Sequence, residues 1–229
     1  MSPPLCFQRR IPGTPAAAVF VACEGAATLL GITQQIIGED WLNSHGFQYS
    51  GSIGPLPVDK CMRTTIEQIG NVLADRFELT GLFGVDTILN TDGVWTIEVN
   101  PRYTASVEIV ERATGIRALE LHAAACTGNA IQRGGDAPAH SVGRTHGKAT
   151  LFAKRDIVLT EQFADFTLTE ALKSPWPTLA DVSPAGTPIE AGRPILNLFA
   201  EGVNVNEVEQ SLRQRVAVIE RQLYGSDLP

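Results

Sequence analysis

Short apolar runs separated by turn residues fill the first quarter of the chain, a pattern typical of β-strands. The segment PGTP at residues 12–15 is a turn signal between two of these runs. The strands expected from the pattern cover residues 6–11, 17–22, 28–36 and 47–53. Because their connections are short, they predict a small antiparallel sheet.

From residue 58 onward, apolar residues recur every three or four positions, the spacing of an amphipathic helix. The residues on this stripe are Met62, Ile66, Ile69, Leu73 and Phe77. Two strands, 83–90 and 94–100, follow around the turn signal Thr91-Asp92-Gly93. Two short helices, 106–114 and 117–127, are then expected to end at Gly115 and Gly128.

The last third of the chain starts with a polar, glycine-rich stretch, 130–147, which predicts a loop and a subdomain boundary. A strand at 148–154, irregular sequence to residue 188 and a strand at 194–200 are expected next. The final helix has a start resembling a capping box, Asn204 with Glu207, and a stop at Gly225. Its apolar stripe consists of Val208, Leu212, Val216, Ile219 and Leu223.

Composition narrows the class of protein. The 229 residues are 44% hydrophobic and 19% charged, as in an ordinary globular protein. The formal net charge of −7 argues against nucleic-acid binding driven by bulk charge. No apolar run is long enough to span a bilayer and no signal peptide is evident, so a cytoplasmic protein without membrane partners is expected. The four cysteines form no C-x-x-C pair and are expected to be buried free thiols.

The strand pair at 83–100 holds the candidate chemistry. A three-residue loop with Gly93 in the left-handed region would place Asp86 opposite Glu98. Two like charges facing each other on a sheet destabilise it by up to about 1 kcal/mol. A bound cation would make the same arrangement stabilising. Alternation predicts one face with Trp95, Ile97 and Val99, and the other with Thr96, Glu98 and Asn100.

Oxygen atoms of Asp86, Glu98 and Asn100 would form a ligand set suited to Mg²⁺. Arg102 follows on the same face and could hold a phosphate or carboxylate through two hydrogen bonds. The alternative is a solvent-facing hairpin whose polar face happens to contain acids.

An aspartate strand, a short turn and a strand with E-x-N-P-R together resemble the metal-binding hairpin of ATP-grasp enzymes, a superfamily that includes biotin carboxylase and D-alanine–D-alanine ligase. The resemblance implies that Asp86, Glu98 and Asn100 ligate the magnesium ions that bridge ATP phosphates. Arg102 would be the catalytic residue that stabilises an acyl phosphate. ATP and Mg²⁺ are the implied cofactors.

The resemblance also implies nucleotide-binding residues. Ile88 and Ile97 would line the purine. The segment Gln8, Arg9, Arg10 and Ile11 is similar to the hinge strand of the family, whose backbone contacts the adenine edge; the alternative is an ordinary polar edge strand. Many members place a ribose-binding acid after the following turn, where this chain has Pro15 and Ala16. Gln34 and Gln35 either face the nucleotide or belong to a solvated strand pair.

The C-terminal part is similar to the closing subdomain of biotin-carboxylase-like members, through residues 147–151, Ala180-Asp181 and Gly186. The nearest subgroup is that of predicted carboligases related to biotin carboxylase. The implied architecture is α+β, a partial ATP-grasp fold of antiparallel sheets with flanking helices. Its expected parts are a partial lid at 1–57, a core with the metal hairpin at 58–135, and a C-terminal subdomain at 136–229.

The implied activity is that of a Mg-ATP-dependent ligase, which activates a carboxylate to an acyl phosphate that an amine or thiol then captures. Family members usually begin with an N-terminal domain, a phosphate-binding lysine strand and a glycine-rich loop. This chain reaches the hinge segment at Gln8, so a truncated or incomplete ligase is expected. The alternatives are a non-catalytic remnant and an interaction subunit. Expected partners are small carboxylate and amine substrates, and either a second copy or a complementing N-terminal fragment.

Other polar residues receive structural interpretations. Lys60, Lys148 and Lys154 are expected to be surface charges. His122 lies among leucine and alanines and is expected to be structural. Glu108 either reaches the substrate or favours the start of a helix. His140 and His146 lie near the presumed cleft, either as substrate contacts or as polar loop residues.

Overall fold

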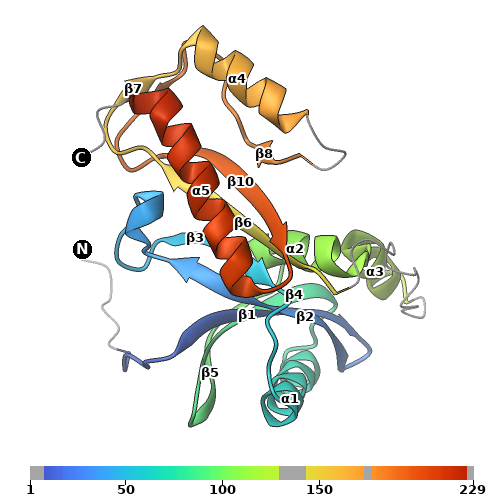
Figure 1. Cartoon of the computed structure of the whole chain (residues 1–229). Helices are drawn as coiled ribbons and strands as arrows, with labels where there is room; N and C mark the ends of the chain where they lie inside the picture. The colour runs from blue at the N-terminus through green and yellow to red at the C-terminus, as the bar shows by residue number, and fades with distance from the viewer. Residues whose placement is uncertain (1–7, 129–142, 173–176, 226–229) are drawn as a thin grey trace, which may run out of the picture.

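The computed structural model describes residues 8–128, 143–172 and 177–225. Its main feature is an antiparallel sheet of eight strands in the order β5-β4-β1-β2-β3-β6-β10-β8 (Figure 1). The strands are β1 Thr14–Cys23, β2 Ala26–Ile37, β3 Tyr49–Gly54, β4 Gly81–Asn90, β5 Gly93–Asn100, β6 Thr145–Phe152, β8 Leu179–Ala180 and β10 Pro194–Gly202. The predicted α+β class with antiparallel strands and flanking helices is confirmed.

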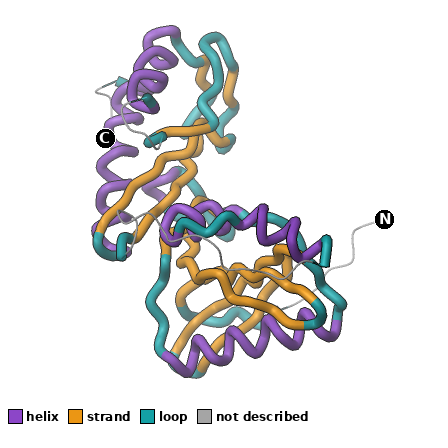
Figure 2. Tube along the Cα trace, turned by 90° about the vertical axis from the view of Figure 1, so that its right-hand side faces the viewer, coloured by secondary structure: helices purple, strands orange, loops and turns teal. Residues whose placement is uncertain are grey.

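Helices cover both faces of this sheet (Figure 2). They are α1 Lys60–Arg76, α2 Ala105–Thr114, α3 Ala118–Cys126, α4 Glu161–Ala171 and α5 Val205–Tyr224. A short 3₁₀ turn, η1 Asp40–Leu42, and a two-stranded sheet of β7 Ile157–Val158 with β9 Pro188–Ile189 complete the described elements. None of the helices among the described residues combines the length and apolarity needed to cross a membrane.

Helix α1 packs on one face of β1, β2 and β4. Phe20 and Phe83 stack at a centroid distance of 5.0 Å within this layer. Gly70 permits the close approach of α1, because a Cβ at this position would lie 2.4 Å from the Phe20 ring. Of the predicted stripe, Ile66 is buried and Ile69 and Leu73 pack partly buried against the same cluster, whereas Phe77 lies beyond the last helical residue and is 68% exposed. Cys61 on α1 and Cys126 on α3 are exposed, so the prediction of buried cysteines is wrong for these two.

Helices α2 and α3 pack on the opposite face of the same strands. Their buried residues, Val107, Val110, Leu121 and others, contact Val19 and Leu82. His122 has the structural role expected for it, since its Nδ1 accepts a hydrogen bond of 3.0 Å from the backbone N–H of Leu82.

Helix α5 covers β6 and β10 and closes the C-terminal part of the core. Val208, Leu212, Val216 and Ile219 are buried as the stripe predicts. The Asn204 side chain caps the helix by accepting from the Glu207 N–H at 2.9 Å. The Glu207 carboxylate accepts from the N–H of Val203, one residue before the position that a capping box uses.

Several boundaries differ from the prediction. Residues 8–11 are not a strand, and residues 6 and 7 lie outside the described residues. Residues 145–147, expected in a loop, begin strand β6, and 129–142 lie outside the described residues. The segment expected to be irregular before residue 188 contains α4, whose N-cap Thr160 accepts from the Phe163 N–H at 3.1 Å.

Candidate functional site

The β4–β5 hairpin brings the two predicted carboxylates together. Asp86 lies directly opposite Glu98, and Gly84 lies opposite Asn100. The predicted three-residue loop is wrong, because Asn90 pairs with Gly93 and leaves a loop of two residues. The register shifts by one residue between Asp86 and Thr87, and this bulge restores the Asp86–Glu98 alignment that the longer loop would have produced.

Because of the same bulge, the prediction that Val99 shares a face of β5 with Trp95 and Ile97 is wrong. Val94 and Val99 both pack against the cluster under α1, although residues five apart on a regular strand point to opposite faces. Val99 therefore does not share a face with Trp95. Trp95 and Ile97 remain 38% and 42% exposed.

Asp86 lies in a polar and half-buried environment. The Gln35 side chain donates to Asp86 Oδ1 at 2.9 Å, and the Asn100 amide donates to Asp86 Oδ2 at 3.3 Å. Burial and the neighbouring Glu98 charge raise the pKa of Asp86, while the Gln35 hydrogen bond and the Arg102 charge lower it. The net raised pKa shows that the fold holds this carboxylate where its charge is disfavoured.

The donor set fits a magnesium ion that keeps other ligands. The hairpin offers two carboxylates and one amide, the oxygen ligands that Mg²⁺ prefers, and phosphates and water would supply its other ligands. Among the described residues, no group of three His, Cys, Asp or Glu side chains could hold a metal by itself. Hard oxygen coordination shared with a phosphate ligand is therefore the chemistry that this hairpin suits.

Arg102 lies beside these oxygens, as predicted. Its guanidinium donates to Asn100 Oδ1 at 3.4 Å and to the Tyr103 carbonyl at 3.2 Å. The residue is exposed, so the cation can turn toward a ligand above the hairpin.

The predicted nucleotide-binding residues are only partly brought together. Gln8, Arg9 and Arg10 are exposed, and Ile11 is half-buried. The backbone directly after these four residues contacts the hairpin, since Asn90 Nδ2 donates to the Pro12 carbonyl at 2.9 Å.

Ile88 lies at this junction. A Cβ at Gly13 would come within 2.6 Å of the Ile88 side chain, so glycine is required for the close approach. Ile88 pairs with Trp95, whereas Ile97 lies at the bulge on the exposed edge strand.

A row of polar residues extends the site across the sheet. Gln35 on β2 is the cross-strand partner of Ser52 on β3, and Ser52 is the partner of Lys148 on β6. Direct partners share a face with Cβ atoms about 5 Å apart. This row could not be predicted from the sequence, because the β3–β6 pairing joins residues about a hundred positions apart and has no local signal.

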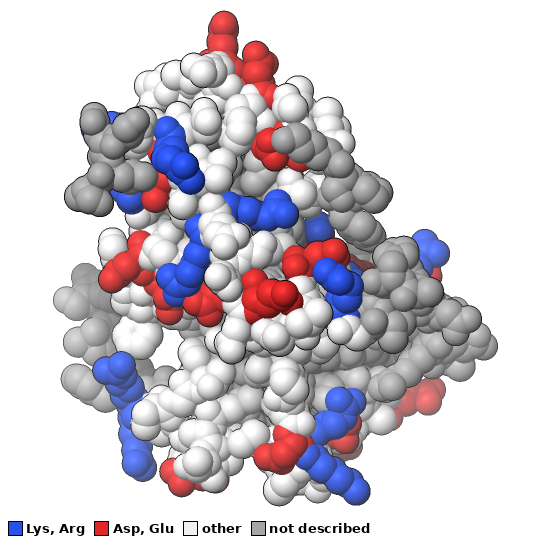
Figure 3. Space-filling view, in the orientation of Figure 1, with Lys and Arg blue, Asp and Glu red and all other residues white. Residues whose placement is uncertain are grey.

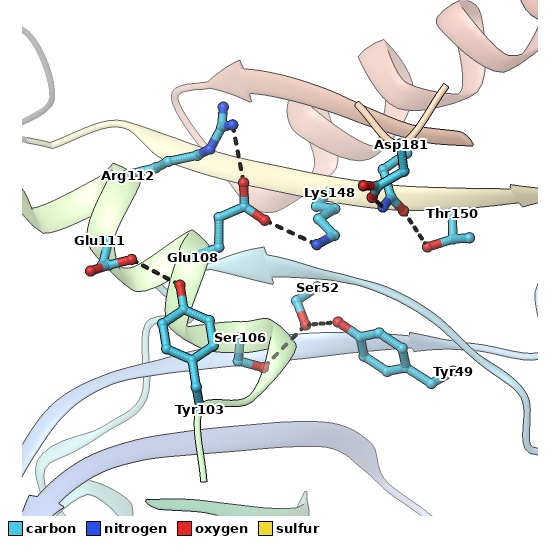
Figure 4. A network of polar contacts seen from close by, with 11 residues as sticks. Tyr49, Ser52, Tyr103, Ser106, Glu108, Glu111, Arg112, Lys148, Thr150 and Asp181 are labelled. Carbon is cyan, nitrogen blue, oxygen red and sulfur yellow. Dashed lines mark hydrogen bonds and ion pairs between the residues drawn. The ribbon is translucent and has the colours of Figure 1, made fainter. Parts of the chain in front are cut away.

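Lys148 is not the surface charge that was expected. Its side chain is 16% exposed, and its Nζ lies 2.9 Å from Glu108 Oε2 (Figure 4). Arg112 binds the other Glu108 oxygen at 3.1 Å. On the face of the molecule drawn in Figure 3, charged side chains of both signs lie next to one another across the middle.

Two further polar residues line the same region. The Tyr49 hydroxyl lies 2.8 Å from Ser52 Oγ, and burial raises the pKa of Tyr49 to about 12, with added effects of the Asp86 and Glu108 charges. His146 on β6 is half-buried, and burial lowers its pKa. The other histidine expected near the cleft, His140, lies outside the described residues.

The antiparallel sheet thus carries an acidic hairpin at one edge and helices on both faces. Residues 2–106 match the family model of the ATP-grasp domain. This match ends at residue 106, and over the rest of the chain the likeness to known proteins is one of fold.

Solved structures support this fold. An L-amino acid ligase from Bacillus licheniformis has a TM-score of 0.68 at 15% identity, over 91% of this chain and 51% of that one. Phosphoribosylglycinamide synthetase from Anaerococcus prevotii gives a TM-score of 0.67 at 15% identity, over 91% and 53%. N5-carboxyaminoimidazole synthase from Aspergillus clavatus, in complex with ADP and 5-aminoimidazole ribonucleotide, gives 0.61 at 15% identity, over 91% and 52%. The chain thus spans about half the length of these structures, and no curated protein matches its sequence.

Proposed function

We propose that this chain is the metal-binding part of a Mg-ATP-dependent ligase that joins a carboxylate to an amine or thiol. The observation that carries the proposal is the Asp86–Glu98 pair, two acids aligned across a hairpin with the amide of Asn100 beside them. The names of the similar structures, among them an amino acid ligase and a synthetase, agree with this reaction class.

In the proposed reaction, a carboxylate oxygen attacks the terminal phosphorus of ATP and ADP leaves. The nucleophile then attacks the carbonyl carbon of the acyl phosphate, and inorganic phosphate leaves. Such phosphoryl transfer depends mainly on positioning and charge neutralisation. When bound, Mg²⁺ would neutralise phosphate charge and orient the transferring group.

The residues of this chain have separate roles in the proposal. Asp86, Glu98 and Asn100 hold the metal, and the Gln35 hydrogen bond fixes the orientation of the Asp86 carboxylate. Arg102 stabilises the charge of the acyl phosphate, because its guanidinium is exposed next to the metal ligands. The backbone near Ile11 and the side chain of Ile88 form the adenine side of the site.

The second candidate is a non-catalytic ATP-grasp remnant or interaction subunit. It is favoured by one observation, the position of β5 at the edge of the sheet with Trp95 and Ile97 exposed. An unpaired edge with apolar side chains is suited to pairing with another chain. A complementing N-terminal fragment or a second copy is the partner in this candidate.

Calorimetric titration of ADP and ATP, with and without Mg²⁺, tests the first candidate. The wild type is expected to bind nucleotide in a magnesium-dependent manner, and Glu98→Gln is expected to weaken that binding by about tenfold or more, roughly 1.4 kcal/mol. Equal binding by both proteins would refute the assigned metal site. An absence of nucleotide binding by the wild type would favour the second candidate.

A further inference from the structure

A second group of polar residues lies on the same sheet face as the metal hairpin, on β3 and β6, which are three and four strands away from β4. Lys148 and Ser52 are direct cross-strand partners on β6 and β3. The residues before and after Lys148 on β6, Gly147 and Ala149, are buried on the side that α5 covers. By alternation, Lys148 and Thr150 therefore point away from α5 and toward α2.

Lys148 is held in place rather than left to move in solvent. Its Nζ donates to Glu108 Oε2 at 2.9 Å, while Arg112 donates to Glu108 Oε1 at 3.1 Å. The Arg112 guanidinium also stacks on the Phe199 ring, 3.8 Å from its centroid. Glu108 thus orients two cations, and an ammonium has three donors, of which this ion pair uses one.

A chain of hydroxyl groups lies beside Lys148. The Tyr49 hydroxyl is hydrogen-bonded to Ser52 Oγ at 2.8 Å, and Ser52 Oγ is hydrogen-bonded to Ser106 Oγ at 3.2 Å (Figure 4). Three hydroxyl groups bring three protons, and the two mutual hydrogen bonds use two of them. One O–H donor is left over, at Tyr49, Ser52 or Ser106 according to which hydroxyl groups donate in the two hydrogen bonds.

Helix α2 begins beside this chain of hydroxyl groups, since Ser106 lies in its first turn. Thr104, its N-cap residue, makes no side-chain cap hydrogen bond, and its Oγ1 is buried without a partner. The helix start lies against β4, since a Cβ at Gly84 would come within 2.8 Å of Thr104. Backbone N–H groups of a first helical turn favour a negative charge. Ser106 belongs to this turn and also to the hydroxyl chain.

We propose that Lys148, together with the Tyr49–Ser52–Ser106 hydroxyl chain, binds an oxyanion of the substrate other than the nucleotide. The ligand chemistry is that of a carboxylate or phosphate group. Glu108 is a positioning residue, which holds the ammonium group of Lys148, the cross-strand partner of Ser52, through their ion pair. This inference rests on the proposed ligase function, and it names the charge that the second substrate carries.

The neutral donors support this assignment. Tyr49 and the two serines remain hydrogen-bond donors because they are protonated at neutral pH, and the raised pKa of the Tyr49 hydroxyl strengthens that point. A cation with neutral donors beside it favours a ligand that only accepts hydrogen bonds. Carboxylate and phosphate groups are such ligands. The other carboxylate on this part of α2, Glu111, accepts from the Tyr103 hydroxyl and from the Ala118 N–H.

The test is a titration of the whole chain with inorganic phosphate, and separately with succinate, in the absence of Mg²⁺ and nucleotide. Heteronuclear NMR follows the backbone amides of the wild type, Lys148→Gln, Tyr49→Phe and Arg102→Gln. Lys154→Gln is the matched control, because Lys154 also pairs with a glutamate, Glu220, at 3.0 Å.

The expected result is saturable shifts at the amides of Ser52, Ser106 and Lys148. Lys148→Gln should weaken binding about tenfold or more, and Tyr49→Phe about fivefold, as for a charged and a neutral hydrogen bond. Lys154→Gln should leave it unchanged. Tighter binding of succinate would assign a carboxylate substrate, and tighter binding of phosphate a phosphorylated one.

Two results would overturn the inference. One is a wild type that shows no saturable shifts at these amides; this measurement needs no variant and holds even if Lys148→Gln fails to fold. The other is binding that survives Lys148→Gln but is lost in Arg102→Gln, which would place the anion at the metal hairpin. Either result leaves the ligase proposal intact, because that proposal fails only if magnesium-dependent nucleotide binding is unaffected by Glu98→Gln.

Discussion

Asp86 and Glu98 are direct cross-strand partners, and the fold places the first of them where burial and the second charge both raise its pKa. Two acids in this relationship destabilise the hairpin when no cation is bound. The arrangement is understandable if the resting protein tolerates a small cost in stability in return for metal binding.

Asp86→Asn is expected to stabilise the metal-free protein at pH 7 by up to about 1 kcal/mol, because it removes one of two opposed charges. Chemical denaturation in EDTA measures this change. Asp92→Asn, in the exposed turn of the same hairpin, is the matched control and should be near neutral. A clear loss of stability in Asp86→Asn would contradict the electrostatic account.

The pH dependence of stability follows from the raised pKa of Asp86. A carboxyl whose pKa is higher in the folded than in the unfolded state favours folding in its protonated form. Its contribution is present below the ordinary value of 3.8 and is lost as pH rises through the folded pKa. The free energy of unfolding of Asp86→Asn should therefore lack the decline that the wild type shows as pH rises above 3.8. Parallel curves for the two proteins would exclude the shift.

Tyr49 gives a second pH prediction. Its pKa is raised to about 12 from 10.0, so the unfolded chain loses this proton first as pH rises. The stability that the buried hydroxyl contributes is complete below pH 10 and disappears as pH approaches 12. Tyr49→Phe should reduce the fall in the free energy of unfolding over this interval. An equally steep fall in the variant would mean that Tyr49 is not buried in the folded protein.

Gly70→Ala is expected to destabilise the protein by about 1–3 kcal/mol, the usual cost of overpacking. The added Cβ would lie 2.4 Å from the Phe20 ring and would push α1 away from the sheet. In an exposed helix the same change would stabilise by about 0.5–1 kcal/mol. Thermal unfolding distinguishes the two signs, and Val72→Ala on the exposed side of α1 serves as the control.

Much of the site could be predicted from local sequence. The Asp86–Glu98 pair follows from strand alternation and from a turn signal between two apolar runs. The bulge could not be predicted, because it depends on how Val94 and Val99 both reach the cluster under α1. A three-residue loop without a bulge and a two-residue loop with one give the same pairing at Asp86. The predicted Asp86–Glu98 pair is therefore confirmed although the predicted loop length is wrong.

The rest of the site depends on long-range strand order. Lys148 meets Glu108 only because β6 pairs with β3, and α2 packs against both strands. Neither residue has a local pattern that distinguishes it from a solvated charge. Helix α4 was missed for a different reason, since its buried residues Phe163 and Thr167 form too narrow a stripe to stand out from the surrounding proline-rich sequence.

The central claim is that the hairpin binds the metal of a metal–nucleotide complex. The most direct measurement is NMR with Mn²⁺ in place of Mg²⁺, in the presence of ADP, because a paramagnetic ion broadens the amides around it. Broadening is expected to centre on Asp86, Glu98 and Asn100, and to disappear from these amides in Glu98→Gln. Broadening that centres on another part of the chain, or that is unchanged in Glu98→Gln, would contradict the account.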